Sequence, residues 1–346
     1  MSFHQKIIDI PFGNGGIGIN EPVKIIAEIG INHEGDIGRC KSMVQMAAEA
    51  GADAIKLQTA DPDEHYQKGT QSHNIFSRAM LTKKETAEIF QYCHDHNILP
   101  MTTCGDVSTL DFINSLEPVA HKISSGLAAH HFIVRKIAET GRPVFISTGM
   151  ASLPEITDTV NVARETGNPH IALMQCVSIY PCPPELTNLS AIRMMSDYFG
   201  MHVGYSDHSV GVDVPVFSVA AGARFIEKHF SDDPNRAGFD HAISADYTEL
   251  KDMVIKVRKG ELILGDGNKV LNDEQLAVAK KYQRFLVARK AIEPSEPLSL
   301  ENIVVQRLAL PQPSFVSAKF FDDIIGKKVN HRIEAGEALK LSDIKR

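Results

Sequence analysis

The chain has 346 residues, 43% hydrophobic and 23% charged, with a formal net charge of −7. This length suits one large domain with a small one beside it, and the negative charge argues against a nucleic-acid surface. No apolar run reaches the roughly 20 residues that a membrane span needs. The first residues do not have the pattern of a signal peptide, and the five cysteines include no CxxC spacing. We therefore expect reduced thiols in a cytoplasmic protein.

The first 22 residues hold two short strand-like pieces around "FGNGG". We expect a hairpin that closes the bottom of the fold. Eight apolar runs follow, and their near-continuous hydrophobicity is typical of strands buried on both faces of a parallel sheet. The runs are 24–30, 53–59, 98–103, 119–126, 143–149, 170–176, 201–207 and 223–229.

Helix-like segments separate these runs. Thr82 with Glu85, and Ser152 with Glu155, have the capping-box spacing of a helix start. The other segments are 36–50, 106–116, 132–140, 185–198, 210–221 and 247–264. Eight strands alternating with eight helices predict a (β/α)8 TIM barrel over residues 1–264. A doubly wound sheet is the alternative, and the lack of Gly-x-Gly-x-x-Gly after the first strand favours the barrel.

The composition of the sequence changes after the last predicted helix of the barrel. Residues 265–284 are polar and are predicted to be a linker or a short helix. Residues 291–303 and 332–344 then match at six of thirteen positions, 41 residues apart. The repeat predicts a small β-rich domain over 285–346, which is too small for a large core of its own.

Polar side chains end nearly every predicted strand, and in such a barrel function sits at these carboxyl ends. They are Glu28, Lys56, Gln58, Thr102, Thr103, Lys122, Ser124, Ser125, Ser147, Gln175, Ser206, Asp207, His208, Glu227, Lys228 and His229. A single polar residue there can simply meet water. Lys56 and Lys122, however, are flanked by apolar strand residues, and a buried lysine needs a partner.

An anionic ligand is the simplest partner for these lysines. With Ser125 and Ser147 they suit a phosphate and a carboxylate, while a Schiff base on either lysine is the alternative. His208 and His229 end adjacent strands and suit Mn²⁺ or a similar ion rather than a closed zinc site, because no thiolate accompanies them. The spacing alone leaves open a hydrogen-bonded surface pair.

Several motifs occur together: "EIGINHEG", "HKISSG", "FISTGM", "GYSDHS", "IEKHF" and the ending "IIGKKVNHRIEAGEALKLSDI". Over nearly its whole length the chain resembles the sialic acid synthase (N-acetylneuraminate synthase) family, the nonulosonic acid synthases, with their C-terminal antifreeze-like (SAF, β-clip) domain. The resemblance implies a transferase that condenses phosphoenolpyruvate with an N-acetylated amino-sugar aldehyde by C–O cleavage, releasing phosphate. It also implies a divalent metal such as Mn²⁺ and no organic cofactor.

The resemblance assigns roles residue by residue. It places phosphoenolpyruvate on Lys56, Lys122, Ser125 and Ser147, and the metal on His208 and His229. Glu28 and Glu227 become catalytic carboxylates together with the two lysines, and the choice of base between them stays open. The implied sugar contacts are Gln58, Tyr180, Asp240 and Arg307, the last lent to the partner subunit's site in a domain-swapped homodimer.

Three departures from the family pattern concern the sugar. Leu127 stands where the family carries an acidic residue, Ser178 where some members carry Asn, and "LALPQPSF" replaces Pro-Gly after Arg307. The resemblance implies N-acetylmannosamine or a relative as the acceptor, and these departures lead us to expect a less usual one, a 2,4-diacetamido hexose with fewer free hydroxyls. The alternatives are a sugar-phosphate 3-deoxyulosonate synthase, which would lack this C-terminal domain, a Schiff-base aldolase, and a sugar-binding protein that has lost catalysis.

Overall fold

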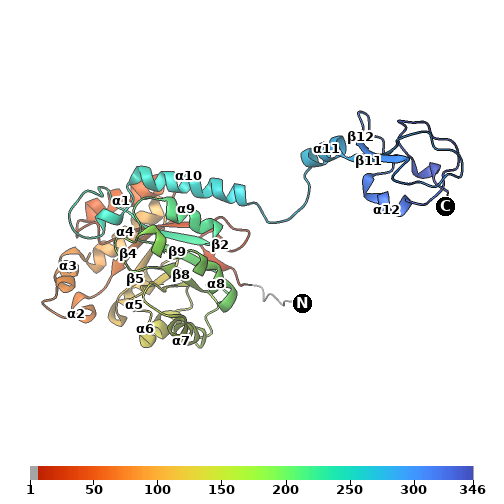
Figure 1. Cartoon of the computed structure of the whole chain (residues 1–346). Helices are drawn as coiled ribbons and strands as arrows, with labels where there is room; N and C mark the ends of the chain where they lie inside the picture. The colour runs from red at the N-terminus through yellow and green to blue at the C-terminus, as the bar shows by residue number, and fades with distance from the viewer. Residues whose placement is uncertain (1–6, 346) are drawn as a thin grey trace. The chain divides into compact units, whose positions relative to one another are not determined.

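Eight parallel strands close into a barrel with the ring order β10-β3-β4-β5-β6-β7-β8-β9 (Figure 1). The structure, a computed structural model, describes residues 7–345. The strands are β3 (Lys24–Gly30), β4 (Ala54–Thr59), β5 (Leu99–Cys104), β6 (His121–Ile123), β7 (Val144–Ser147), β8 (Ile171–Cys176), β9 (Val203–Asp207) and β10 (Phe225–His229). The predicted barrel is confirmed, and the doubly wound alternative is wrong because the sheet has no open edge.

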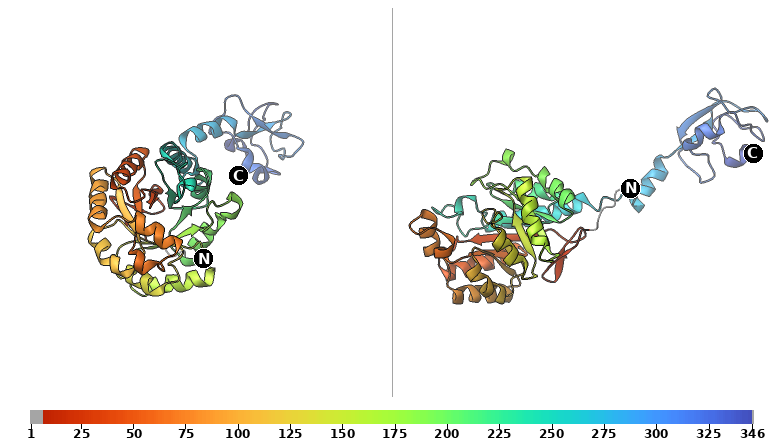
Figure 2. Two further views of the ribbon diagram at one scale, coloured as in Figure 1. Left: turned by 90° about the vertical axis from the view of Figure 1, so that its left-hand side faces the viewer. Right: turned by 90° about the horizontal axis from the view of Figure 1, so that it is seen from below.

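A helix follows each strand and lies on the outside of the barrel (Figure 2). These helices are α1 (Ile37–Ala50), α4 (Lys83–Asp95), α5 (Val107–Ser115), α6 (His131–Ala138), α7 (Leu153–Arg164), α8 (Ser190–Phe199), α9 (Asp213–Ala220) and α10 (Tyr247–Leu264). The predicted capping box forms at α4, where the Thr82 hydroxyl accepts from the Glu85 N–H and the Glu85 carboxylate accepts from the Thr82 N–H. None of the helices within residues 7–345 is long and apolar enough to cross a membrane.

Two regions differ from the sequence prediction. The helix expected from residue 185 begins only at Ser190, after a 3-10 turn over Pro184–Leu186 and a left-handed Asn188. Between β4 and α4, two helices were not predicted, α2 (Pro62–His65) and α3 (Gln71–Ala79). Both are short, and their composition is dominated by polar residues, so neither shows the apolar repeat by which helices are found in a sequence.

A hairpin closes the amino-terminal end of the barrel, as predicted. β1 (Ile10–Phe12) and β2 (Gly15–Ile17) pair antiparallel. Their buried side chains pack against the inward-facing residues of the lower barrel, which are Ile26, Ala54, Met101, Ala120, Phe145, Ala172, Met174 and Phe225. Two residues further along the strands, the same inner face carries polar side chains, because side chains alternate along a strand. The interior of the barrel is therefore apolar at the amino-terminal end, a cluster that we call the apolar plug, and polar at the carboxyl end.

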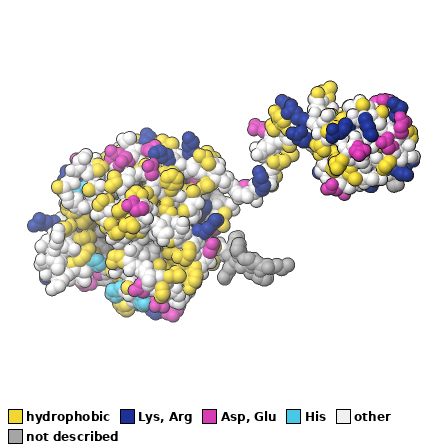
Figure 3. All heavy atoms as spheres, in the orientation of Figure 1, with side chains coloured by type: hydrophobic (Ala, Val, Ile, Leu, Met, Phe, Trp, Pro, Cys, Tyr) yellow, Lys and Arg dark blue, Asp and Glu magenta, His cyan; other side chains and the backbone are white. Residues whose placement is uncertain are grey.

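The second unit begins at Asp266 and has its own core. It contains α11 (Asp273–Tyr282), β11 (Arg284–Ala288), β12 (Ile303–Arg307), α12 (Phe321–Ile324) and 3-10 turns at Ala318–Phe320 and Leu341–Asp343. Repeat-equivalent Ile292 and Ile333 exchange both backbone hydrogen bonds, at 2.9 and 3.0 Å. Both lie in the core, so the repeat folds as two halves facing each other. On the face drawn in Figure 3, side chains of both charges are interspersed.

Candidate active site

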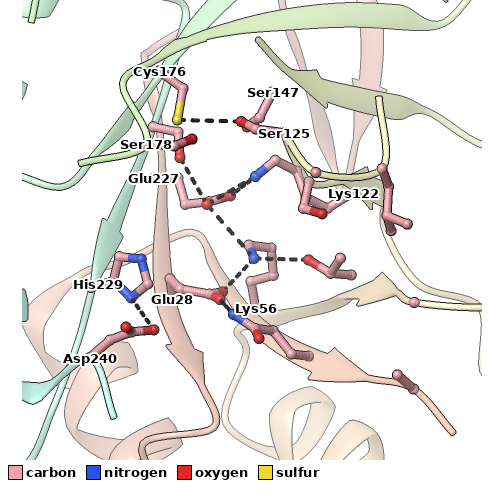
Figure 4. A pocket seen from close by; sticks show the side chains of 18 of the residues that line it. Glu28, Lys56, Lys122, Ser125, Ser147, Cys176, Ser178, Glu227, His229 and Asp240 are labelled. Carbon is pink, nitrogen blue, oxygen red and sulfur yellow. Dashed lines mark hydrogen bonds and ion pairs between the residues drawn. The ribbon is translucent and has the colours of Figure 1, made fainter. Parts of the chain in front are cut away.

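A cavity of about 390 Å³ lies at the carboxyl ends of the barrel strands, within the usual size of a ligand pocket (Figure 4). Eleven of the twelve predicted site residues line it: Glu28, Lys56, Gln58, Lys122, Ser125, Ser147, Tyr180, His208, Glu227, His229 and Asp240. Arg307 is exposed at the end of β12 in the second unit.

Strand register explains why residues so far apart in the sequence meet. On β10, Phe225 faces the apolar plug, so Glu227 and His229 also face inward. His229 pairs with Glu28 across β10 and β3, and Glu28 pairs with Lys56 across β3 and β4. The charged residues of the mouth are thus placed by adjacent strands of the barrel.

Two lysines and two glutamates form a buried charge cluster in the mouth. Nζ of Lys56 lies 2.7 Å from Oε2 of Glu28 and 3.7 Å from Oε1 of Glu227. Nζ of Lys122 donates to both carboxylate oxygens of Glu227 at 3.0 Å. All four side chains are at most 4% exposed. Because these side chains are almost fully buried, their charges are weakly screened, and each lysine is held by a carboxylate of the protein until a ligand competes for it.

The pKa values of the two carboxyl groups, Glu28 and Glu227, are shifted in opposite directions. Burial raises the pKa of Glu28 to about 7, and the attraction of Lys56 offsets only part of this effect. Burial also disfavours the charge of Glu227, but Lys122 and Lys56 outweigh it and hold the pKa of this carboxyl below its usual value. Glu28 is therefore poised to exchange a proton near neutral pH, whereas Glu227 stays ionised.

Hydroxyl groups beside Lys122 complete an anion-binding region. Oγ of Ser147 is buried without a hydrogen-bond partner among residues 7–345, and Oγ of Ser125 accepts the N–H of Gly149 at 3.0 Å. Burial lowers the pKa of Lys122, whereas the carboxylates of Glu227 and Glu28 overcome the burial of Lys56 and raise its pKa. A buried hydroxyl without a partner next to an ammonium group is what a bound phosphate or carboxylate oxygen would satisfy.

The histidine pair fits a divalent ion. Nδ1–H of His208 donates to the carbonyl of Val177 at 2.7 Å, so Nε2 is its unprotonated nitrogen and accepts from the Tyr180 hydroxyl at 2.9 Å. Nδ1 of His229 is buried and has no hydrogen-bond partner in the described part of the chain; it lies 3.6 Å from Oδ2 of Asp240. The rings are 5.4 Å apart, and burial lowers the pKa of both imidazoles, which keeps them neutral as ligands must be.

Two imidazoles alone would not complete the coordination shell of a divalent ion. Among residues 7–345, no group of three or more His, Cys, Asp or Glu side chains has the arrangement of a metal site. Two neutral imidazoles with open positions suit an ion that takes oxygen ligands from water or substrate, such as Mn²⁺, and not a closed zinc site.

Some strand-end residues point away from the cavity. Nε2 of Gln175 donates to the carbonyl of Thr187 at 2.9 Å, and the Thr102 hydroxyl donates to the carbonyl of Leu57. Lys228 pairs with Asp207 behind the barrel wall. Each of these residues is next in sequence to one that lines the cavity. Because successive side chains of a strand point to opposite faces, they point away from the cavity.

Sequence reasoning missed part of the lining. His65, Tyr66 and Phe76 come from the segment around α2 and α3, and Met150 and Cys176 also line the cavity. The signal available was length, because more than 20 residues separate the predicted strand 53–59 from the next predicted helix, and such long connections are often functional. Leu127 lines the cavity and is otherwise packed in the core.

Asn32 was also missed, and it fixes the loop that carries Asp240. Its Oδ1 accepts the N–H of Asp240 at 3.1 Å, and its Nδ2 donates to the carbonyl of Phe230 and to Oγ of Ser244, both at 3.0 Å. The side chain is fully buried. Asn32 therefore sets where the Asp240 carboxylate lies beside His229.

Comparisons with known proteins agree with this architecture. The NeuB family profile matches residues 43–269, and the SAF domain profile matches residues 283–345. Pseudaminic acid synthase of Campylobacter jejuni is 35% identical over 96% of this chain and 99% of its own length. N,N'-diacetyllegionaminic acid synthase of the same species is 32% identical over 91% of this chain and 98% of its own.

A solved structure agrees as well. The N-acetylneuraminic acid synthetase of Leptospira borgpetersenii, crystallised with citrate, superposes with a TM-score of 0.76 at 34% identity, covering 80% of this chain and 96% of that one. With a profile match over most of the barrel and relatives aligned from end to end, the chain belongs to the NeuB family and carries its SAF domain at the C-terminus.

Proposed function

We propose that this protein condenses phosphoenolpyruvate with the open-chain aldehyde of an N-acetylated amino sugar, giving a nonulosonic acid and phosphate. The observation that carries the proposal is the pair of buried ammonium groups, Lys56 and Lys122, in a cavity that also holds two carboxylates and two neutral imidazoles. The full-length relatives, which are synthases of pseudaminic and N,N'-diacetyllegionaminic acid, support the same reaction class.

In this reaction the enol carbon of phosphoenolpyruvate attacks the aldehyde carbon, and water adds to the carbon that bears the phosphate. The tetrahedral intermediate then expels phosphate, so the C–O bond breaks and the bridging oxygen leaves with phosphorus. Lys56, Lys122, Ser125 and Ser147 are the proposed anion-binding residues, because ammonium and hydroxyl groups stabilise the departing phosphate.

Glu28 is the proposed general base for the water. A base works best when its pKa lies near the working pH, and burial raises the pKa of Glu28 to about 7. Glu227 is a weaker base because two lysines hold its pKa below the usual value. Its proposed role is to keep Lys122 and Lys56 charged and aligned.

His208 and His229 are the proposed ligands of a divalent metal, Mn²⁺ or a similar ion, with no organic cofactor. Bound there, the ion would polarise the aldehyde oxygen of the sugar as a Lewis acid. The neutral imidazoles and the partnerless Nδ1 of His229 support the assignment.

The sugar is proposed to contact Gln58, Tyr180 and Asp240, and a 2,4-diacetamido hexose is the proposed acceptor. Leu127 gives the cavity an apolar surface where an acidic side chain would bind hydroxyls, and acetamido methyl groups suit such a surface. We further propose a homodimer in which the partner subunit's Arg307 completes the sugar site. In this chain Arg307 is exposed, and its guanidinium lies 4.6 Å from the ring centroid of Tyr282. A monomer in light scattering would contradict the dimer.

A phosphate-release assay tests the reaction. Phosphoenolpyruvate labelled with ¹⁸O at the bridging oxygen is incubated with Mn²⁺ and, separately, with N-acetylmannosamine and with 2,4-diacetamido hexoses. We expect labelled phosphate, the highest kcat/KM with a diacetamido sugar, and loss of activity in EDTA that Mn²⁺ restores. Unlabelled phosphate, or no release with any aldose, contradicts the reaction, whereas a preference for N-acetylmannosamine contradicts only the sugar.

A Schiff-base aldolase is the competing function, since burial lowers the pKa of Lys122 as it does in amine nucleophiles. The contact of Lys122 with both oxygens of Glu227 favours the ammonium form instead. Borohydride in the presence of pyruvate discriminates the two, because it would trap a lysine adduct only in an aldolase.

A further inference from the structure

Behind the histidine pair, on the outer face of the barrel wall, lies an ion pair that the proposed chemistry does not use. Nζ of Lys228 is 2.7 Å from Oδ2 of Asp207, and neither side chain is exposed at all. The two residues are opposite each other in the register of β9 and β10. The ion pair therefore joins the two strands at the last rung before their carboxyl ends.

Every polar contact of this pair returns to the same short stretch of chain. Oδ1 of Asp207 accepts from the Tyr205 hydroxyl at 3.1 Å, and from the N–H and the hydroxyl of Ser209 at 3.1 and 2.8 Å. Nζ of Lys228 also donates to the carbonyl of Ser209. The residues on both sides of His208 are thus fixed to the residue that precedes His229.

An ion pair buried this deeply needs a reason other than stability. Removing two charges from water is costly, and well-packed apolar side chains can often replace such a pair without loss. Apolar residues, however, would not fix the register and the turn after β9 through directional bonds. What lies immediately beyond the pair is His208 on one strand and His229 on the other, with ring centroids 5.4 Å apart.

We propose that Lys228 and Asp207 are positioning residues that set the spacing of His208 and His229 for a divalent metal. The inference rests on the proposed metal site. Metal ligands must be held within about 0.5 Å of their productive positions, so the supporting contacts matter as much as the ligands. The ion pair acts from outside the cavity and touches neither substrate nor metal.

The test measures Mn²⁺ binding without substrates. The double variant Asp207→Asn/Lys228→Met removes both charges and leaves no unpaired one, and Ser209→Ala removes one hydrogen bond to Asp207. Free Mn²⁺ is counted by its electron paramagnetic resonance signal, which bound ion loses. We expect the double variant to bind at least about 10-fold more weakly, the loss typical of ligand-supporting contacts, and Ser209→Ala to bind several-fold more weakly.

Asp53→Asn is the matched control. Asp53 is a partly buried carboxylate at the opposite end of the barrel, where it accepts the N–H of Ile25 at 2.8 Å and pairs with Arg258 at 3.3 Å. This variant should lower the melting temperature and keep the Mn²⁺ affinity of the unsubstituted protein. A parallel loss of affinity in the control would mean that destabilisation alone weakens binding, and the proposal would be wrong.

Crystal structures of the metal-free proteins give a second readout. If the double variant folds and keeps both the ring spacing and the Mn²⁺ affinity, the proposal is wrong. If the double variant does not fold, an unchanged Mn²⁺ affinity in Ser209→Ala overturns the proposal instead. If the unsubstituted protein binds no Mn²⁺, the metal site itself is refuted. The positioning role is then decided by whether the 5.4 Å ring separation changes in the variant structure.

Discussion

Replacing Glu28 by Gln should separate the stability of the barrel from its chemistry. The pKa of Glu28 lies at about 7 in the fold against 4.5 for an ordinary glutamate. Such a difference corresponds to about 3 kcal/mol of unfolding free energy, present below pH 4.5 and lost as the pH rises through 7. At pH 8.5 the ionised Glu28 therefore destabilises the fold, and Glu28→Gln should be the more stable protein.

The measurement is urea unfolding of both proteins at pH 5 and pH 8.5, followed by circular dichroism because the chain has no tryptophan. The stability of Glu28→Gln relative to the unsubstituted protein should increase by about 2–3 kcal/mol between the two pH values. Glu88→Gln is the control, since Glu88 pairs with Lys41 at the surface and exposed pairs contribute at most about 1 kcal/mol. A relative stability that does not change with pH would refute the reasoning.

The same variant tests the chemistry. If Glu28 is the base, kcat/KM should fall as the pH drops below 7, and Glu28→Gln should remove this pH dependence and reduce kcat by about 10²–10⁴-fold. A stabilised and inactive variant at pH 8.5 would show that this carboxylate is kept for function at a cost in stability. Full activity in Glu28→Gln would exclude Glu28 as the base.

Three further substitutions probe the structure around the site. Lys122→Met leaves the buried Glu227 with the hydroxyl of Ser206 and the longer ion pair to Lys56, so thermal unfolding should show a loss of about 3–5 kcal/mol, and the KM for phosphoenolpyruvate should rise. Asn32→Ala removes the acceptor of the Asp240 N–H and should cost about 1–3 kcal/mol while raising the KM for the sugar more than that for phosphoenolpyruvate. Gly204→Ala would place a methyl group 2.6 Å from the aromatic ring of the facing β10 residue, so it should cost about 3 kcal/mol or prevent folding. Wild-type melting temperatures in any of these variants would contradict the packing described.

Much of the barrel site could be predicted from sequence because a parallel barrel turns order along the chain into position. Once 24–30 and 223–229 are assigned as strands, Glu28 and His229 must both reach the same end of the barrel. The period of two then separates Glu227 and His229, which face inward, from Lys228, which does not.

The parts that escaped prediction depend on contacts that the strand pattern does not encode. His65 and Tyr66 line the cavity from a segment that lies against the residue after β5, where Nδ1 of His65 is 2.7 Å from the carbonyl oxygen of Gly105. Asn32 acts through three hydrogen bonds to residues about 200 positions away. The state of Glu28 also depends on burial, which is known only once the barrel is built.

The arrangement of charge suggests why Lys56 touches both glutamates. Without a ligand, two ammonium groups and the ionised Glu227 would leave the mouth positively charged, and Glu28 brings it to neutrality when it is ionised. An incoming phosphate and carboxylate compete with Glu28 for Lys56. Glu28 can accept a proton at that moment because its pKa already lies near 7. The protonated carboxyl releases Lys56 to the ligand, whereas only the ionised carboxylate can take a proton from water. A pKa near 7 keeps both forms accessible at neutral pH, so the same burial serves binding and the proposed base catalysis in turn.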